Sequence, residues 1–224
     1  MIKLSKRLEM VASLISKNSK VADIGADHGY LISYLVEYGL ISRAYACENK
    51  KGPFSRLKEN IKEYNLLDKI QVELSDGIST LPTDIDTVII AGMGGDTVKK
   101  IIYDSLDKLI NINCFIISSH TKMYEVRETL TSLGYYIEDE NACFDEDKFY
   151  EVSKFIKGKK EYSKIEIKYG PILLKQKNKE LLNKLTLEIL NNEKIATLDF
   201  IPLSKKNKLQ EENNELKQII NMIK

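Results

Sequence analysis

The segment from residue 21 to residue 30, VADIGADHGY, constrains the fold of this chain more than any other. Residues 21–24 have the apolar character of a buried strand, and Gly25 and Gly29 enclose a short turn that leads into an apolar helix near Tyr30. A strand, a glycine turn and a helix N-terminus form a pocket in which a ligand can approach the backbone and its free N–H groups. The segment therefore predicts a strand, turn and helix unit of an α/β domain, with a ligand site at the turn.

Strand-like and helix-like segments go on alternating up to Gly134. After the first strand we expect strands over residues 44–47, 70–74, 86–91 and 114–117, and helices over residues 30–37, 53–64, 96–103 and 124–133. This alternation implies a mainly parallel sheet covered by helices on both faces. Two strand-like runs then follow without a helix between them, residues 135–144 and 149–156, and predict an antiparallel hairpin at the sheet edge. We therefore expect a seven-stranded, mainly parallel sheet.

Helical patterns occupy both ends of the chain. Residues 2–16 predict a helix docked on the domain, with Lys3, Lys6 and Arg7 on its surface. After Gly158 the composition shifts to Lys, Glu, Asn and Leu, and apolar stripes over residues 175–192 and 205–223 predict an antiparallel helical hairpin, an arm resembling a short coiled coil. We thus expect two parts, a ligand-binding domain over residues 1–157 and a helical arm over residues 158–224.

The arm is the basic part of the chain. Residues 158–224 carry 14 basic and 9 acidic side chains, whereas residues 1–157 carry 20 and 24. A basic arm on a nearly neutral body suits a polyanionic partner. A solvated, lysine-rich helical pair explains the charge equally well.

Several protein classes are excluded by composition. The sequence has no run of about 18 apolar residues, so we expect no membrane contact, and its N-terminal segment lacks the features of a signal peptide. The cysteines Cys47, Cys114 and Cys143 are odd in number, widely spaced and set in apolar runs, which indicates packed, reduced thiols rather than disulfides or metal ligands. We therefore expect a cytoplasmic protein that uses no metal and acts as a monomer.

Three successive predicted strands each deliver a carboxylate at the carboxyl edge of the sheet, where open sheets bind ligands. Glu48 follows Gly25 by 23 positions, the place of an acidic residue that accepts hydrogen bonds from a ribose. Asp76, followed by Gly77, could accept from an adenine amino group, although an ordinary turn aspartate has the same sequence context. Together with Asp23 in the first strand, these residues predict a nucleoside site.

The acidic residues in and next to the first glycine turn indicate which nucleoside binds there. A pyrophosphate would be repelled by Asp23 and Asp27, whereas a cationic amino acid tail would be attracted. S-adenosylmethionine has such a tail, with an ammonium and a sulfonium. The turn also lacks the third glycine of a dinucleotide site and places Asp27 and His28 in the phosphate path, so methyl transfer ranks above hydride transfer.

Residues 91–95, AGMGG, predict close approach of a cofactor or acceptor, because three glycines at a strand end cost backbone entropy. The Asn/Asp-Pro-Pro-aromatic clamp of amino-group methyltransferases is absent here, which favours a ring nitrogen as acceptor. For His28, a packing role and a functional role are both open. His120 could face the same cleft, but a loop histidine in solvent is the simpler interpretation.

These motifs resemble those of a known family. The segments 23–30 (DIGADHGY) and 90–95 (IAGMGG), with Gly52-Pro53, Asp76-Gly77 and Gly134-Tyr135, are similar to the bacterial tRNA (adenine-N1) methyltransferases that modify adenine 22. The resemblance implies a Rossmann-like class I fold, S-adenosylmethionine as methyl donor, tRNA as acceptor and a C-terminal coiled coil. One departure is Ser118-Ser119-His120, where the family has glutamine, proline and asparagine, so the acceptor-gripping role of this loop is in doubt.

The candidate site follows from the motifs and the resemblance together. We expect Asp27 to stabilise the positive charge that methylation creates on adenine, and His28 to position it or relay a proton. Two alternatives stay open, a small-molecule methyltransferase and a non-catalytic RNA-binding protein on a methyltransferase fold. The candidate cofactor-binding residues are Asp23, Gly25, Ala26, Asp27, His28, Gly29, Tyr30, Glu48, Asp76, Gly77, Ala91, Gly92 and Met93.

Overall fold

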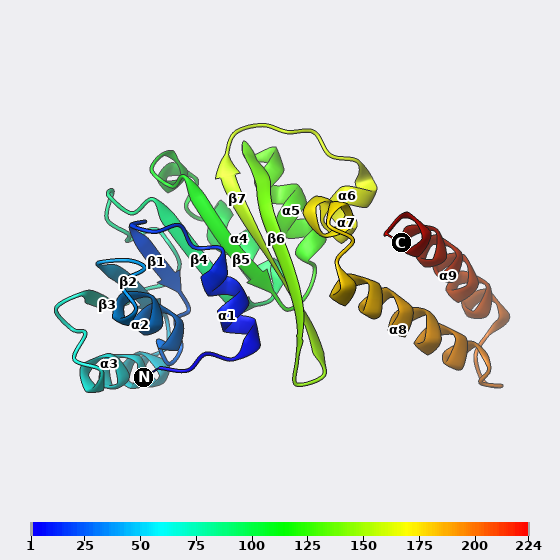
Figure 1. Cartoon of the computed structure of the whole chain (residues 1–224), viewed down its shortest axis with the longest axis horizontal. Coiled ribbons are helices and arrows are strands. Elements are labelled where there is room, and N and C mark those ends of the chain that lie inside the picture. Colours follow the sequence, from blue (N-terminus) through cyan, green and yellow to red (C-terminus); the bar gives the residue numbers. More distant parts are fainter. Residues whose placement is uncertain (1, 224) are drawn as a thin grey trace.

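A computed structural model describes residues 2–223 and contains a single seven-stranded sheet (Figure 1). The strand order is β3-β2-β1-β4-β5-β7-β6, and only β7 runs antiparallel to its neighbours β5 and β6. The expected seven-stranded, mainly parallel sheet with a terminal antiparallel hairpin is thereby confirmed. The strands are β1 (Val21–Ile24), β2 (Ala44–Glu48), β3 (Ile70–Leu74), β4 (Thr87–Met93), β5 (Cys114–Ser119), β6 (Tyr135–Asp145) and β7 (Lys148–Lys157).

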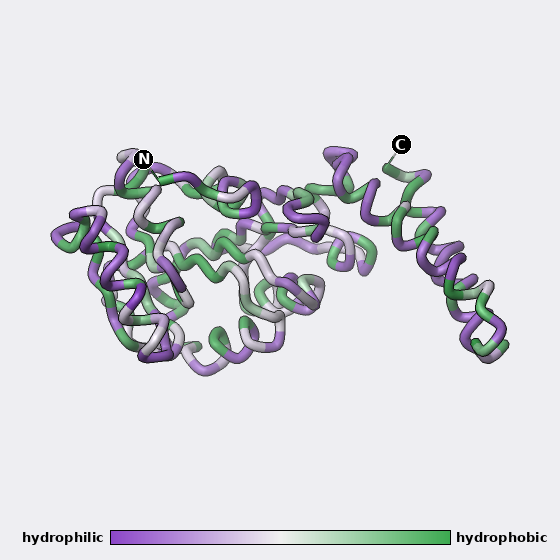
Figure 2. The backbone as a smooth tube through the Cα atoms, turned by 90° about the horizontal axis from the view of Figure 1, so that it is seen from below, coloured by the Kyte–Doolittle hydropathy of each residue, from purple (hydrophilic) through white to green (hydrophobic). Residues whose placement is uncertain are grey.

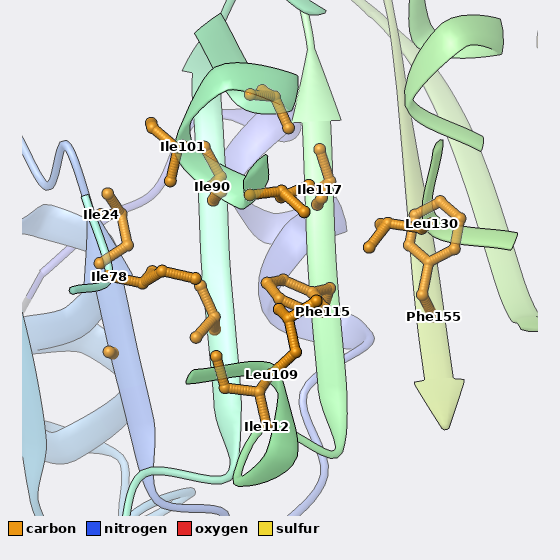
Figure 3. Packing of buried hydrophobic residues seen from close by; sticks show 14 of the residues in the cluster. Ile24, Ile78, Ile90, Ile101, Leu109, Ile112, Phe115, Ile117, Leu130 and Phe155 are labelled. Atoms are coloured by element: carbon orange, nitrogen blue, oxygen red, sulfur yellow. The ribbon is translucent and has the colours of Figure 1, made fainter. Parts of the chain in front are cut away.

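Helices cover both faces of the sheet. The helices α1, α2 and α3 enclose one apolar cluster, while α4 and α5 enclose the other, on the face where Ile90, Ile117 and Phe115 lie (Figure 3). The short helices α6 and α7 were not anticipated from sequence, because neither is long enough to display a helical period. The helices are α1 (Lys6–Ser13), α2 (Tyr30–Glu37), α3 (Lys51–Glu63), α4 (Gly95–Tyr103), a 3₁₀ turn (Leu106–Ile110), α5 (Met123–Ser132), α6 (Lys164–Tyr169), α7 (Pro171–Lys175), α8 (Lys179–Ala196) and α9 (Leu203–Ile223).

The strand order reverses at β1, and this reversal positions the ligand site. β1 pairs in parallel with β2 on one side and with β4 on the other, so the connections leaving β1 and β4 diverge. Open α/β sheets bind ligands in the crevice that such a divergence leaves at the carboxyl ends of the strands. The glycine-rich segment contributes directly, since β4 continues through Gly92 to Met93 instead of ending at Ala91 as expected, with a register shift at this point in its pairing with β5.

The arm is a pair of helices in contact, α8 and α9, that projects from the sheet domain beyond β6 (Figures 1 and 2). Asn178 caps α8 with its side chain, and the turn that contains Pro202 precedes α9. The buried side chains of Asn192 and Asn213 hydrogen-bond at 3.0 Å across the pair, which fixes its antiparallel register. The apolar cluster between the two helices continues into Tyr169 and Leu173 of α6 and α7. None of the helices within residues 2–223 has the length and apolarity needed to cross a membrane.

A buried ion cluster joins the arm to the domain. Arg127 of α5 has no exposed side-chain surface and donates to Glu140 on β6 at 2.7 Å and to Glu151 on β7 at 2.5 Å. The other oxygen of Glu140 accepts the backbone N–H of Ile172, at the start of α7, at 2.9 Å. Gly170, between α6 and α7, has φ +92°, and a Cβ there would lie 2.7 Å from Glu140 Oε2. We call this junction the arm root; its backbone packs directly on the ion cluster.

We expect Arg127→Ala to lower the free energy of unfolding by about 3–5 kcal/mol, because it leaves buried carboxylates without their counter-ion. Urea denaturation followed by circular dichroism measures the change. The exposed Arg56→Ala on α3 is the matched control and should shift stability by less than about 0.5 kcal/mol. Equal stabilities for the two variants would contradict the proposed importance of the cluster.

Candidate functional site

A cavity of about 630 Å³ opens at the carboxyl ends of β1, β2 and β4. We call it the cleft. It gathers side chains and backbone from the two motifs that the sequence singled out and from the end of β2, as expected for neighbouring parallel strands. The predicted site residues that line it are Asp23, Gly25, Ala26, Asp27, His28, Tyr30, Glu48, Ala91, Gly92 and Met93.

Three of the candidates lie outside this lining. Gly29, with φ +72°, begins α2, and a Cβ there would be 2.6 Å from Leu57 on α3. Gly77 packs near Ile101. Asp76 is connected to the cleft indirectly, because Asn49, which does line it, donates to the Asp76 carboxylate at 3.2 Å.

The glycine turn after β1 has a conformation that its residues make possible. Gly25 has φ +72° and Asp27 φ +51°, and aspartate is among the few side chains that tolerate the left-handed region. A Cβ on Gly25 would collide with the terminal methyl of Met93, so the glycine turn after β1 and the glycine-rich end of β4 are in contact. The bare backbone at Gly25 thus leaves room for the end of the Met93 side chain at the floor of the cleft.

Asp23 is the buried charge of the cleft. Its exposed fraction is 4%, and burial raises the pKa of its carboxyl from 3.8 to about 7, with Arg7 opposing the rise and Glu48 adding to it. A carboxyl held near neutrality ionises readily when a cation arrives, since an opposite charge lowers its pKa. This is the behaviour expected of a residue that faces an ammonium group.

Glu48 is buried at the end of β2, with an exposed fraction of 8%. Its Oε1 accepts the backbone N–H groups of Asn49 at 3.0 Å and Lys50 at 3.3 Å. Among residues 2–223 its Oε2 has no hydrogen-bond donor. The side chain is therefore held in place by one oxygen and has the other free to accept from ligand hydroxyls.

Asp27 and His28 lie at the exposed rim. The side chains of Asp27 and His28 are 68% and 41% exposed, and His28 Nε2 lies 3.8 Å from Asp27 Oδ1. The His28 ring stacks on Tyr30 with centroids 5.5 Å apart. Both residues are thus accessible from solvent at the mouth of the cleft.

Sequence reasoning missed several residues of the lining. Arg7 was expected on the surface of the N-terminal helix, but its side chain enters the cleft, because α1 packs against β6 and directs this face inward. His120, for which the cleft was one of two interpretations and solvent the simpler one, lines the cleft and is exposed. Two of the missed residues, Asn49 and Lys50, directly follow Glu48 and could have been indicated by it. The missed residues are Arg7, Leu8, Leu31, Asn49, Lys50, Pro53 and Thr97.

A second cavity, of about 500 Å³, adjoins the cleft at His120. It lies between the start of α5, β7 and the arm, and its lining includes the aromatic rings of Tyr124, Phe149 and Tyr169. His120 therefore separates the second cavity from the cleft and lines both.

Comparisons with known proteins agree with this geometry. A family model described as a methyltransferase domain matches residues 4–153. The tRNA (adenine(22)-N(1))-methyltransferase of Bacillus subtilis (strain 168) is 34% identical to this chain over 201 residues, which is 87% of this chain and 84% of that protein.

Solved structures match over nearly the whole chain, arm included. The crystal structure of the B. subtilis m1A22 tRNA methyltransferase TrmK has a TM-score of 0.84 at 30% identity and covers 100% of both chains. M. capricolum TrmK in complex with S-adenosyl-homocysteine gives 0.86 at 30% identity, covering 99% of each chain. A Streptococcus pneumoniae protein in complex with S-adenosyl-L-methionine gives 0.89 at 30% identity, covering 97% of this chain and 100% of that one.

The strand order and the cleft at its reversal are those of a class I S-adenosylmethionine-dependent methyltransferase domain. Within this class, the chain belongs to the TrmK family of bacterial tRNA (adenine(22)-N(1))-methyltransferases. The expected fold and family are thus confirmed.

The raised pKa of Asp23 predicts a pH-dependent stability. Between pH 4 and about 7 the folded state binds a proton at Asp23 that the unfolded state has released, so stability falls as pH rises through this range. Asp23→Asn removes this titration. We therefore expect the free energy of unfolding of Asp23→Asn, relative to that of the parent chain, to rise by about 2 kcal/mol from pH 5 to pH 8. Thermal unfolding of the ligand-free protein at both values measures it. The exposed Asp68→Asn is the matched control, and a difference between Asp23→Asn and the parent chain that is the same at pH 5 and pH 8 would contradict the prediction.

Proposed function

We propose that this chain transfers the methyl group of S-adenosylmethionine to N1 of adenine 22 in tRNA, using the cleft for the reaction and the arm to hold the tRNA. One observation carries the proposal. A buried Asp23, a half-satisfied Glu48 and the bare Gly25 backbone meet in one cavity of a TrmK-family chain.

The residues of the cleft fit the cofactor. Glu48 Oε2 lacks a donor among the described residues and can accept from the ribose hydroxyls, and the pair of Asn49 and Asp76 offers polar atoms to the adenine. Asp23 would face the ammonium of the amino acid tail, where ionisation of the buried carboxyl is favoured. When bound, S-adenosylmethionine supplies a methyl group on an electrophilic sulfonium.

The protein's own contribution is mainly positioning. Neutral adenine N1 carries an available lone pair, so no strong base is required for attack, and alignment in a pocket from which water is excluded lowers the barrier. Leu8, Leu31 and Met93 give the cleft apolar walls suited to this. Since N1 is engaged when adenine is paired, the nucleotide has to be unpaired or extruded before it enters.

Asp27 is the residue we assign to charge stabilisation. Methylation at N1 leaves the adenine ring cationic, and a carboxylate fixed at the rim would stabilise that charge as it develops. The turn holds Asp27 in the left-handed region, and His28 stands beside it, stacked on Tyr30. His28 would position this carboxylate or accept the proton later lost from the product.

The charge of the arm supports its role in tRNA binding. Lys168, Lys217 and Lys208 are paired with glutamates of the arm, at 2.6, 3.3 and 4.0 Å. We define the arm tip as residues 194–206. Within the described part of the chain, its lysines Lys194, Lys205 and Lys206 have no ion-pair partner, and beside them Phe200 is 78% exposed. Unpaired cations with an exposed ring are suited to phosphates and unstacked bases.

The function is tested by incubating the purified chain with methyl-labelled donor and an unmodified tRNA transcript. We expect the label at N1 of adenine 22, and none in a matched transcript with guanine at position 22. Label in a metabolite extract but not in tRNA would favour a small-molecule methyltransferase, and no label in either would favour a non-catalytic protein.

In the same assay we expect Asp27→Asn to lower kcat by about 10- to 100-fold, less than the roughly 100- to 1000-fold lost with a buried stabilising group, because the Asp27 side chain is 68% exposed. Its affinity for S-adenosylmethionine, measured separately by calorimetry, should change little. Normal turnover would remove Asp27 from the catalytic residues, while lost cofactor binding would make it a cofactor ligand. The exposed Asp68→Asn serves as control.

For the arm, the triple variant Lys194→Gln, Lys205→Gln, Lys206→Gln should weaken tRNA binding without affecting cofactor affinity. The slope of log affinity against log salt should fall by about 2 to 3, since each lost phosphate contact removes about 0.7–0.9. The control replaces Lys58, Lys62 and Lys69, which are exposed at the opposite end of the sheet, with glutamine. Equal slopes for the two triple variants would show that the arm tip does not contact phosphates.

A further inference from the structure

The loop after β5 holds His120 beside the glycine-rich end of β4. The backbone N–H of His120 donates to the carbonyl oxygen of Met93 at 3.0 Å. The hydroxyl of Ser119 donates to the same oxygen at 3.1 Å. Because the loop is tied to the neighbouring strand in this way, the backbone of His120 is in place before a substrate binds.

The imidazole ring of His120 lies near the bare backbone of Gly92. A Cβ added to Gly92 would be 3.7 Å from His120 Nε2, and the φ of +98° at this glycine is one that other residues rarely adopt. The ring also packs edge-on against Tyr150 of β7, with centroids 5.8 Å apart and planes at 64°. Two strands thus position the ring, and the absence of a side chain at Gly92 leaves room beside Nε2.

The place of His120 in the sheet separates it from the residues that suit the cofactor. In the strand order β2-β1-β4-β5, Glu48 ends β2 and Asp23 lies in β1, whereas His120 follows β5, beyond Gly92 on β4. His120 also lines the second cavity, which the arm borders. A cofactor held by Glu48 and Asp23 therefore leaves His120 available to a second substrate on the side of the arm.

The ring of His120 has one hydrogen-bond acceptor to offer. Desolvation and the positive charges of Arg7 and Lys148 lower the pKa of His120 below its ordinary value, so the ring is neutral at pH 7 and has one N–H and one bare nitrogen. A hydrogen bond with the Gly92 backbone opposes this lowering of the pKa, so the ring is its donor and the carbonyl oxygen its acceptor. The bare nitrogen has no donor among residues 2–223 and is free to accept.

We propose that His120 recognises the target adenine by accepting a hydrogen bond from its exocyclic amino group, N6. This role presupposes the proposed function, methylation at adenine N1, and adds the residue that distinguishes the base. N1 and N6 lie on the same edge of adenine, so a base whose N1 faces the methyl donor presents N6 beside it. Guanine has a carbonyl oxygen in the place of N6, so it would bring an acceptor against an acceptor.

This hydrogen bond would strengthen during the reaction. N1 forms a bond to the methyl carbon as the bond from that carbon to sulfur breaks, and the positive charge passes from sulfur to the adenine ring without a proton transfer. A cationic ring makes the N6 hydrogens more acidic, and a charged donor forms the stronger hydrogen bond. An acceptor at N6 therefore stabilises the transition state more than the bound substrate, which raises kcat.

A substrate that lacks N6 tests the contact directly. Transcripts of tRNA with adenosine or purine riboside at position 22 are compared in single-turnover methylation by the parent chain and by His120→Leu. The intrinsic difference in reactivity between the two bases is the same for both proteins and cancels in the ratio of ratios. We expect the preference for adenosine to fall by about 3- to 10-fold in His120→Leu, the range of one neutral hydrogen bond. His120→Asn, which has a carbonyl oxygen as acceptor, should keep an intermediate preference.

The control and the contrary outcomes use the same assay. Thr121→Ser, on the same loop, should keep the preference of the parent chain, and calorimetry should give His120→Leu the parent affinity for S-adenosylmethionine. An equal loss of rate on both transcripts, with or without weaker cofactor binding, or an unchanged rate on both, would overturn the proposal. His120→Ala gives the same comparison if His120→Leu does not fold. A parent chain that does not methylate the adenosine transcript would contradict the proposed function itself.

Discussion

The parallel pairing of β1 with β2 on one side and β4 on the other is the constraint on which the rest of the structure depends. It brings the ends of three strands to one edge and sends their connections apart, which opens the cleft. At this edge the end of the Met93 side chain lies against the bare Gly25 backbone. The polar groups of the cleft are positioned relative to this edge, including Arg7, which reaches it from α1.

The cleft combines groups of different accessibility. Asp23 and Glu48 are buried below it, while the side chains of Asp27 and His28 at its rim are 68% and 41% exposed. Burial strengthens electrostatic interactions with a small ligand, and exposure permits access of a large one. This separation is what a reaction between a small donor and a macromolecular acceptor requires. It also gives different environments to Asp23, which lies in β1, and Asp27, which lies in the turn that follows it.

Much of this arrangement could be predicted from sequence, because it depends on local patterns. The alternation of strand-like and helix-like segments predicts the sheet, and the two glycine motifs contain most of the predicted residues that line the cleft. Arg7 could not be found this way, since helical periodicity identifies an apolar face but not which neighbour the rest of the helix meets. The extension of β4 through Gly92 was missed for a related reason, because the pairing of Met93 with Ser119 on β5 continues the strand past an unpaired Gly92. The helices α6 and α7 were not predicted because they are too short to show a helical period.

The ion cluster at the arm root has a geometric consequence. Arg127 holds Glu140, which in turn accepts the backbone N–H of Ile172 next to Gly170. The apolar cluster of α8 and α9 continues into α7, so the arm is packed on this junction. The span between the arm tip and the cleft is therefore set when the chain folds. With the tRNA contacts proposed above, selection among RNAs would depend on the spacing between the gripped nucleotides and the methylated one, in addition to their sequence.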